Sequence, residues 1–136
     1  MNIMICCSKI FYPQVRFIKI KLEKLGHKVT LPNSFKSPLM EEEMKKEGSK
    51  RHRTWKARMI RLHRKKIEAN DAILVLNLNR NSEKRYIGGA TFLEIYEAFV
   101  LKRKIFLFCP APDNFLKDEI LGMGAKVIYG DVAKIK

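Results

Sequence analysis

Glu94 is the side chain in this sequence whose position best suits catalysis. It follows a polar loop, residues 77 to 91, and stands at the start of an amphipathic stretch that predicts a helix. A carboxylate in the first turn of a helix is stabilised in its ionised form by the helix dipole, which favours a nucleophile over a general acid. The spacing Thr91-x-x-Glu94 also matches a capping box, in which Glu94 bonds back to the backbone N–H of Thr91. Spacing alone leaves both interpretations open.

Three kinds of residue in the loop before Glu94 could contact a ligand, and each also has a plain structural use. Asn77 and Asn79 follow an apolar run, where an amide could hydrogen-bond a sugar or a base or could form a turn. Tyr86 could stack on a base or pack the loop. Gly88 and Gly89 permit positive φ and a close backbone approach to a ligand, but they form neither a GxGxxG nor a P-loop motif.

Short apolar segments alternate with helical segments along the whole chain. Strands are expected at residues 2 to 7, 27 to 32, 125 to 130 and at both ends of 71 to 109; helices are expected at 13 to 25, 39 to 69 with a break at Gly48, 115 to 121 and inside 71 to 109. This alternation predicts an α/β fold: a doubly wound, five-stranded parallel sheet in the order 2-1-3-4-5 with helices on both faces.

The predicted strand order also predicts where a ligand would bind. Open α/β sheets bind ligands at the carboxyl edge where the strand order reverses, here between the first and third strands. The loop from Cys7 to Phe11, which begins with Ser8 and Lys9, should therefore line a pocket together with the loop from Asn77 to Thr91.

Length and composition favour a small intracellular globular protein. The 136 residues are expected to form one domain, residues 1 to 136, that buries a sizeable core. No apolar run approaches the roughly 20 residues that span a bilayer, and the first residues do not resemble a signal peptide, so we expect a soluble, cytoplasmic protein with no membrane partner. The three cysteines are expected to be buried thiols. The three histidines lack the clustered spacing of metal ligands, so neither a metal nor a cofactor is predicted.

The net charge of +14 points to an anionic partner. Residues 45 to 66 hold eleven Lys and Arg against one acid. They could lean over the pocket and hold a substrate phosphate, bind the backbone of a nucleic acid, or form a solvated helix face. Trp55, Met59, Leu62 and Ile67 form an apolar stripe within this segment, and we expect Trp55 to anchor the helix to the core.

Two stretches of the chain resemble a known family. In the segment around Glu94, the matching positions are Ala69 to Asp71, Gly88, Gly89, Glu94, Ala98 and Lys104 to Phe108. They are similar to the segment around the catalytic glutamate of the nucleoside 2-deoxyribosyltransferase-like superfamily, which includes the deoxynucleoside 5'-monophosphate N-glycosidases. The first strand with its Ser-containing loop, "ICCSKIF", and the following "LEKLGHKVTLP" are also similar to that family.

This resemblance implies a flavodoxin-like (Rossmann-like) fold, dimers in which the partner subunit completes each site, and cleavage of the bond between base and (deoxy)ribose. Glu94 would be the nucleophile and Ser8 a contact to sugar or phosphate. The chain differs from the family at three positions: Met4 replaces a Tyr, Gly88 replaces an Asp or Ser, and His63 replaces an Asp. We expect cleavage or transfer of a nucleoside or nucleoside 5'-monophosphate; the alternative is a non-catalytic protein of this fold that binds nucleotides or nucleic acid.

Overall fold

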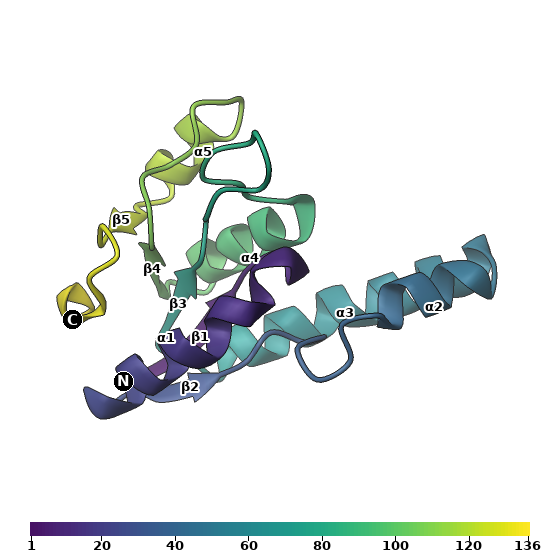
Figure 1. Cartoon of the computed structure of the whole chain (residues 1–136), viewed down its shortest axis with the longest axis horizontal. Helices are drawn as coiled ribbons and strands as arrows, with labels where there is room; N and C mark the ends of the chain where they lie inside the picture. Colours follow the sequence, from purple (N-terminus) through teal and green to yellow (C-terminus); the bar gives the residue numbers. More distant parts are fainter.

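The chain folds around one five-stranded parallel sheet. The computed structural model describes all 136 residues, and its strands run in the order β2-β1-β3-β4-β5 (Figure 1). The strands are β1 (Asn2–Cys6), β2 (Lys28–Thr30), β3 (Ala72–Val75), β4 (Lys104–Leu107) and β5 (Lys126–Val127). Every neighbouring pair is parallel. The predicted doubly wound α/β fold and its strand order are confirmed.

Five α-helices connect or follow these strands. They are α1 (Tyr12–Lys24), α2 (Met40–Lys46), α3 (Ser49–Glu68), α4 (Gly89–Val100) and α5 (Lys117–Gly122), with two 3-10 helices at Lys9–Phe11 and Val132–Lys134. The predicted break in the long second helical segment is confirmed at Gly48. This residue has φ of +117° and is the N-cap of α3, so glycine supplies a backbone conformation that other residues rarely adopt.

Helix α1 shows how local sequence sets an element's ends. Pro13 lies in the first turn, where a missing N–H removes no helical hydrogen bond. Gly26 follows the helix with φ of +88°, and the N–H groups of Gly26 and His27 donate to the carbonyls of Glu23 and Leu22. These two bonds form a Schellman motif, which ends the helix and turns the chain into β2.

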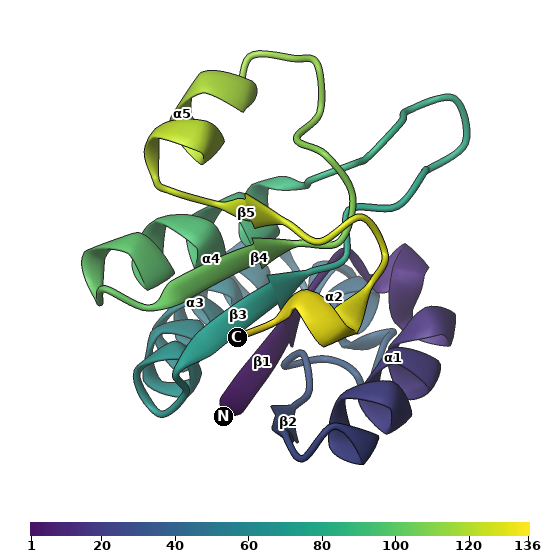
Figure 2. The same ribbon diagram turned by 90° about the vertical axis from the view of Figure 1, so that its left-hand side faces the viewer.

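Helices cover both faces of the sheet (Figure 2), and alternate residues of β1 pack on its two sides. Ile3 and Ile5 pack in one core cluster with α1, and Met4 and Cys6 pack in the other with α3, α4 and α5. Beyond β5, Val132 and Ile135 are buried against the α1 side of the sheet.

Helices α2 and α3 form a pair whose outer end extends beyond the sheet (Figure 1). Only Ile67, near the carboxyl end of α3, is fully buried in this pair. The middle of α3, residues 55 to 63, passes the edge of the sheet where β1 and β3 end and contributes side chains to the candidate site described below. None of the helices has the length and apolarity needed to cross a membrane.

Candidate functional site

A cavity of about 980 Å³ lies at the carboxyl edge of the sheet, where β1 and β3 are neighbours. The segment after β1 lines it from Cys7 to Ile10, and the loop before α4 lines it with Arg80, Tyr86 and Gly88. The two loops that the strand order predicts to flank a pocket are therefore brought together. The loop after β2, Tyr12 of α1 and helices α2, α3 and α4 supply the remaining walls.

Glu94 lies in this cavity, but its place in the helix differs from the prediction. Helix α4 begins at Gly89 with Gly88 as its N-cap, so Glu94 is the sixth helical residue and belongs to the second turn. Thr91 is itself inside the helix and cannot be the N-cap. The capping box is therefore wrong, and so is the first-turn dipole argument, because the dipole effect fades within one turn.

Burial, not the helix dipole, controls the charge of Glu94. Its side chain is 5% exposed, and desolvation raises its pKa to about 7, although a hydrogen bond with the Cys6 thiol and the charge of Lys66 favour the ionised form. Both protonation states are therefore populated near neutral pH. The group can act as a nucleophile when ionised and can carry a proton when neutral.

The two thiols beneath Glu94 are held neutral. Burial and the nearby Glu94 carboxylate raise the pKa of Cys7 to about 12, and the same two causes raise the pKa of Cys6 well above its usual value. All three cysteines of the chain are free; Cys6 and Cys7 are buried, as expected, and Cys109 is half-buried. Because thiols rather than thiolates surround Glu94, the nucleophilic group at this position is the carboxylate.

His63 faces the same cavity from α3. Desolvation, together with the charges of Lys66 and Lys56, lowers the pKa of His63 to about 4, so the imidazole is neutral at physiological pH. Its Nδ1 is buried and has no hydrogen-bond partner. An unpaired polar atom in such a wall is available to a ligand that carries a complementary group.

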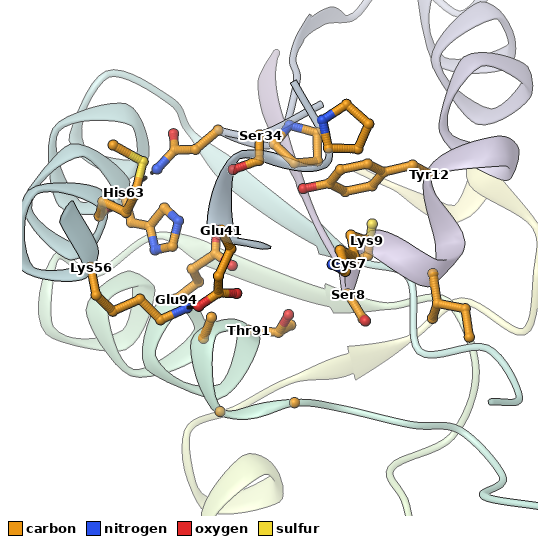
Figure 3. A pocket seen from close by; sticks show the side chains of 18 of the residues that line it. Cys7, Ser8, Lys9, Tyr12, Ser34, Glu41, Lys56, His63, Thr91 and Glu94 are labelled. Carbon is orange, nitrogen blue, oxygen red and sulfur yellow. Dashed lines mark hydrogen bonds and ion pairs between the residues drawn. The ribbon is translucent and has the colours of Figure 1, made fainter. Parts of the chain in front are cut away.

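Helix α2 supplies two carboxylates, and each is paired with a lysine that lines the cavity. Figure 3 shows Glu41 beside Lys56; Glu41 accepts a hydrogen bond from Lys56 at 2.8 Å and interacts with His52 at 2.9 Å. Burial alone would raise the pKa of Glu41, but these partners outweigh it and hold the pKa at about 2. Glu42 forms an ion pair with Lys9. Lys9 and Lys56 are thus paired with α2, whereas Lys45, which also lines the cavity, forms no ion pair.

The N-terminus of α4 also opens into the cavity, since Gly88, Gly89, Ala90 and Thr91 all line it. The first N–H groups of a helix have no acceptor within the helix and carry the positive end of its dipole. The two glycines were expected to serve positive φ, but neither adopts it. Gly88 instead avoids a clash, because a Cβ there would lie 3.1 Å from the Tyr86 hydroxyl.

Several residues singled out in the sequence meet at this cavity: Ser8, Lys9, Tyr86, Gly88, Gly89 and Glu94. Figure 3 shows Cys7, Ser8 and Lys9 on one side and Lys56, His63 and Glu94 on the other. Arg80 lies over the Tyr86 ring, 4.6 Å from its centre. This contact gives Tyr86 a packing role in its loop, and its ring also remains part of the cavity wall.

Asn77 and Asn79 are not brought to the cavity. Asn77 is fully buried, and its side-chain amide bonds the backbone of Cys109 and Pro110 at 2.8 to 2.9 Å. The side chain of Asn79 accepts a hydrogen bond from the backbone N–H of Arg85. Both amides therefore hold the loops after β3 and β4 in shape, which is the turn-forming use that the sequence left open.

Several other cavity residues were not singled out as site residues, among them Tyr12, Glu41, Trp55 and His63. Lys45 and Lys56 line the cavity, as one of the three interpretations of residues 45 to 66 predicts. Trp55 was expected to anchor α3 to the core, but it belongs to neither core cluster and lies half-buried at the cavity wall. The missed signal is helical spacing within the basic segment: positions 52, 55, 56, 59, 63 and 66 recur at intervals of three and four and so share one face.

No group of three or more His, Cys, Asp or Glu side chains is arranged to hold a metal ion. Comparison of the chain with protein-family models, with curated proteins and with solved structures finds no match. The function must therefore be inferred from the residues of the cavity and their chemistry.

Proposed function

We propose that this protein cleaves or transfers the N-glycosidic bond of a nucleoside or a nucleoside 5'-monophosphate, with Glu94 as nucleophile. The ionised carboxylate attacks C1' of the sugar, the C1'–N bond breaks, and the base leaves with its electron pair and takes up a proton from solvent. Water then hydrolyses the glycosyl ester, or a second base attacks it to complete a transfer. No cofactor is needed for either step.

The observation that carries this proposal is the position of Glu94. It is the buried carboxylate of a cavity at the switch point of the sheet, and its pKa of about 7 lies near the operating pH. Carboxylates are rarely buried without a partner of opposite charge in direct contact, and such perturbed groups concentrate at functional sites. The proposal is also supported by the resemblance of residues 69 to 108 to the nucleoside 2-deoxyribosyltransferase-like superfamily, which would make Glu94 the counterpart of that family's nucleophile.

The cavity also supplies two features that suit a phosphate on the substrate. The N-terminal N–H groups of α4 point into it, and helix N-termini favour anions. Lys9 and Lys56 line it as well and are paired with Glu42 and Glu41. A substrate phosphate could replace these two carboxylates as the partner of the lysines, so we propose the 5'-monophosphate as the preferred form.

A homodimer in the cytoplasm is part of the proposal. Leu93 lines the cavity and is 42% exposed, and Tyr96 and Phe99 on the same helix are 51% and 48% exposed. A second copy packed on this part of α4 would bury them and close the cavity, as the family resemblance implies. Analytical ultracentrifugation should give a dimer mass for the native chain and a monomer for the L93E/F99E variant.

The test is to incubate the protein with a panel of ribo- and deoxyribonucleosides and their 5'-monophosphates and to measure free base by chromatography. We expect base release from at least one monophosphate, faster than from the matching nucleoside. Release from none of them, while the same ligands raise the melting temperature, would replace the enzyme by a nucleotide-binding protein of the same fold. If no ligand of the panel gives base release or a thermal shift, both the enzyme and the nucleotide-binding protein are contradicted.

A further inference from the structure

The basic residues of α3 fall into two spatial groups. His52, Lys56, His63 and Lys66 face the cavity or the sheet and are half-buried. The second group lies on the opposite side of the helix and is exposed; it consists of Lys50, Arg51, Arg53, Arg58, Arg61, Arg64 and Lys65. We call these seven residues the outer basic face. Steering of a small substrate into the cavity accounts for the first group but not for charges that point away from it.

The outer basic face is long, and few acids neutralise it. Its residues span positions 50 to 65, which in a helix rising 1.5 Å per residue is about 22 Å. Residues 45 to 66 carry eleven Lys and Arg and one Glu, and so hold most of the chain's net charge of +14. Only two of the seven side chains have an acidic partner: Arg51 with Glu47, and Arg64 with Glu97 at 3.9 Å.

We propose that the outer basic face binds double-stranded DNA through its phosphates. A helix with side chains is 10–12 Å across, which fits the roughly 12 Å major groove of B-DNA, whereas the major groove of A-form RNA is too narrow to admit one. Arg and Lys on one face contact phosphate oxygens without reading sequence. Binding should therefore be independent of sequence and sensitive to salt.

Two other anionic partners fit the face less well. Proteins that bind single strands stack bases on aromatic side chains, but the one aromatic residue of α3, Trp55, lies on the cavity side. A basic helix that binds a membrane buries its apolar face in the lipid, but the inner face of α3 is turned to the cavity and the sheet, where Ile67 is buried. Binding to duplex DNA requires only the outer basic face, which is exposed.

The test is fluorescence anisotropy with a labelled 30-base-pair DNA duplex, titrated at 50 to 200 mM salt. We compare the native chain with the R53Q/R58Q/R61Q variant and with a matched control, R16Q/K24Q/K28Q, which removes three exposed charges elsewhere. The α3 variant should weaken binding about 10-fold or more at 50 mM salt and reduce the slope of log affinity against log salt by about 2 to 3. The control should change the affinity by less than about 3-fold.

A charge-preserving variant, R53K/R58K/R61K, should keep the affinity, and both α3 variants should keep the helical circular dichroism because Gln and Lys are good helix formers. The proposal fails if the duplex does not bind at 50 mM salt, if the control loses as much affinity as the α3 variant, or if the K variant loses as much as the Q variant. Tighter binding to the single strand, or to phosphatidylserine vesicles, would also overturn it. None of these outcomes depends on Glu94 or on turnover.

Discussion

Both sides of α3 carry basic residues, but the two groups differ in burial and in electrostatic environment. On the inner side, burial lowers the pKa values of His63 and Lys66, and the nearby cations lower that of His63 further. On the outer side, residues such as Arg58 and Arg61 are exposed to solvent. One helix thus forms both a wall of the candidate active site and a solvent-facing basic surface.

The comparison shows that a count of charges does not predict what the charges do. Desolvation makes inner polar groups depend on specific partners, so that the inner Lys56 is matched by Glu41. Outer groups are satisfied by water and interact through the field that they share. Substitutions on the inner side should therefore change stability and pH dependence, and those on the outer side should change only affinity for polyanions.

The largest contrast should appear in stability. Ile67→Ala, at the one fully buried position of α3, should lower the free energy of unfolding by about 2 to 5 kcal/mol because it leaves a cavity in the core. Arg61→Ala, on the exposed side, should change it by no more than about 0.5 kcal/mol. Urea denaturation of both variants measures this, and equal losses would mean that α3 has no distinct inner side.

The next contrast concerns the pH dependence of stability, on which the buried groups His63 and Glu94 have opposite effects. The pKa of His63 is about 4 in the folded protein and 6.5 in the unfolded chain. The unfolded chain therefore binds a proton first, and the free energy of unfolding falls as pH falls from 6.5 to 4. The pKa of Glu94 is about 7 against 4.5, so its contribution is lost as pH rises from 4.5 to 7. Between pH 4.5 and 6.5 the two slopes cancel.

Each single substitution should leave the pH dependence of stability that the other group causes. In His63→Gln the unfolding free energy should fall with rising pH, and in Glu94→Gln it should rise, each by up to about 1.4 kcal/mol per pH unit. The double variant should resemble the native chain in its shallow dependence. Urea midpoints at pH 5 and 6.5 measure these slopes. Slopes of the same sign in the two single variants would contradict the pKa shift given for His63 or for Glu94.

A smaller effect is expected where α2 meets α3. Glu41→Gln removes the carboxylate that pairs with Lys56 and His52 and should lower stability at pH 7 by about 1 kcal/mol. The exposed pair of Glu23 and Lys19 is the control, and Glu23→Gln should lower it by about 0.5 kcal/mol or less. The folded pKa of Glu41 is about 2, so the advantage of the native chain over Glu41→Gln should vanish as pH falls from 4.5 to 2. A difference that persists at pH 2 would contradict the pairing.

The fold was predictable because its signals are local and repeated. Strands buried on both faces give apolar runs such as 72 to 75, Gly26 and Gly48 mark helix boundaries, and the alternation of the elements limits the topology. The position of the pocket followed from the strand order alone. The strand expected at residues 125 to 130 is also present, although β5 covers only Lys126–Val127. The burial of Val132 and Ile135 gave no such signal, since it depends on where the C-terminal residues pack.

The site was predictable only in part because burial is a tertiary property. Glu94 was identified by its place after the loop, but the N-cap of its helix is Gly88, three residues before the expected Thr91, so the expected dipole effect gave way to desolvation. Asn77 is polar and near the edge, yet its amide is used within the fold. His63 was hidden in a run of basic residues, and only its helical phase separates it from them.

The most direct test of the central claim is the rate of base release by Glu94→Gln, with Glu97→Gln as the matched control on the same helix. The claim is that the buried Glu94 is the nucleophile, and Gln preserves its shape while removing its charge. With the best monophosphate of the panel, Glu94→Gln should lower the rate at least about 10³-fold and still show a nucleotide-induced thermal shift, and Glu97→Gln should keep the native rate within about 3-fold. Turnover by Glu94→Gln close to that of the native chain would contradict the claim.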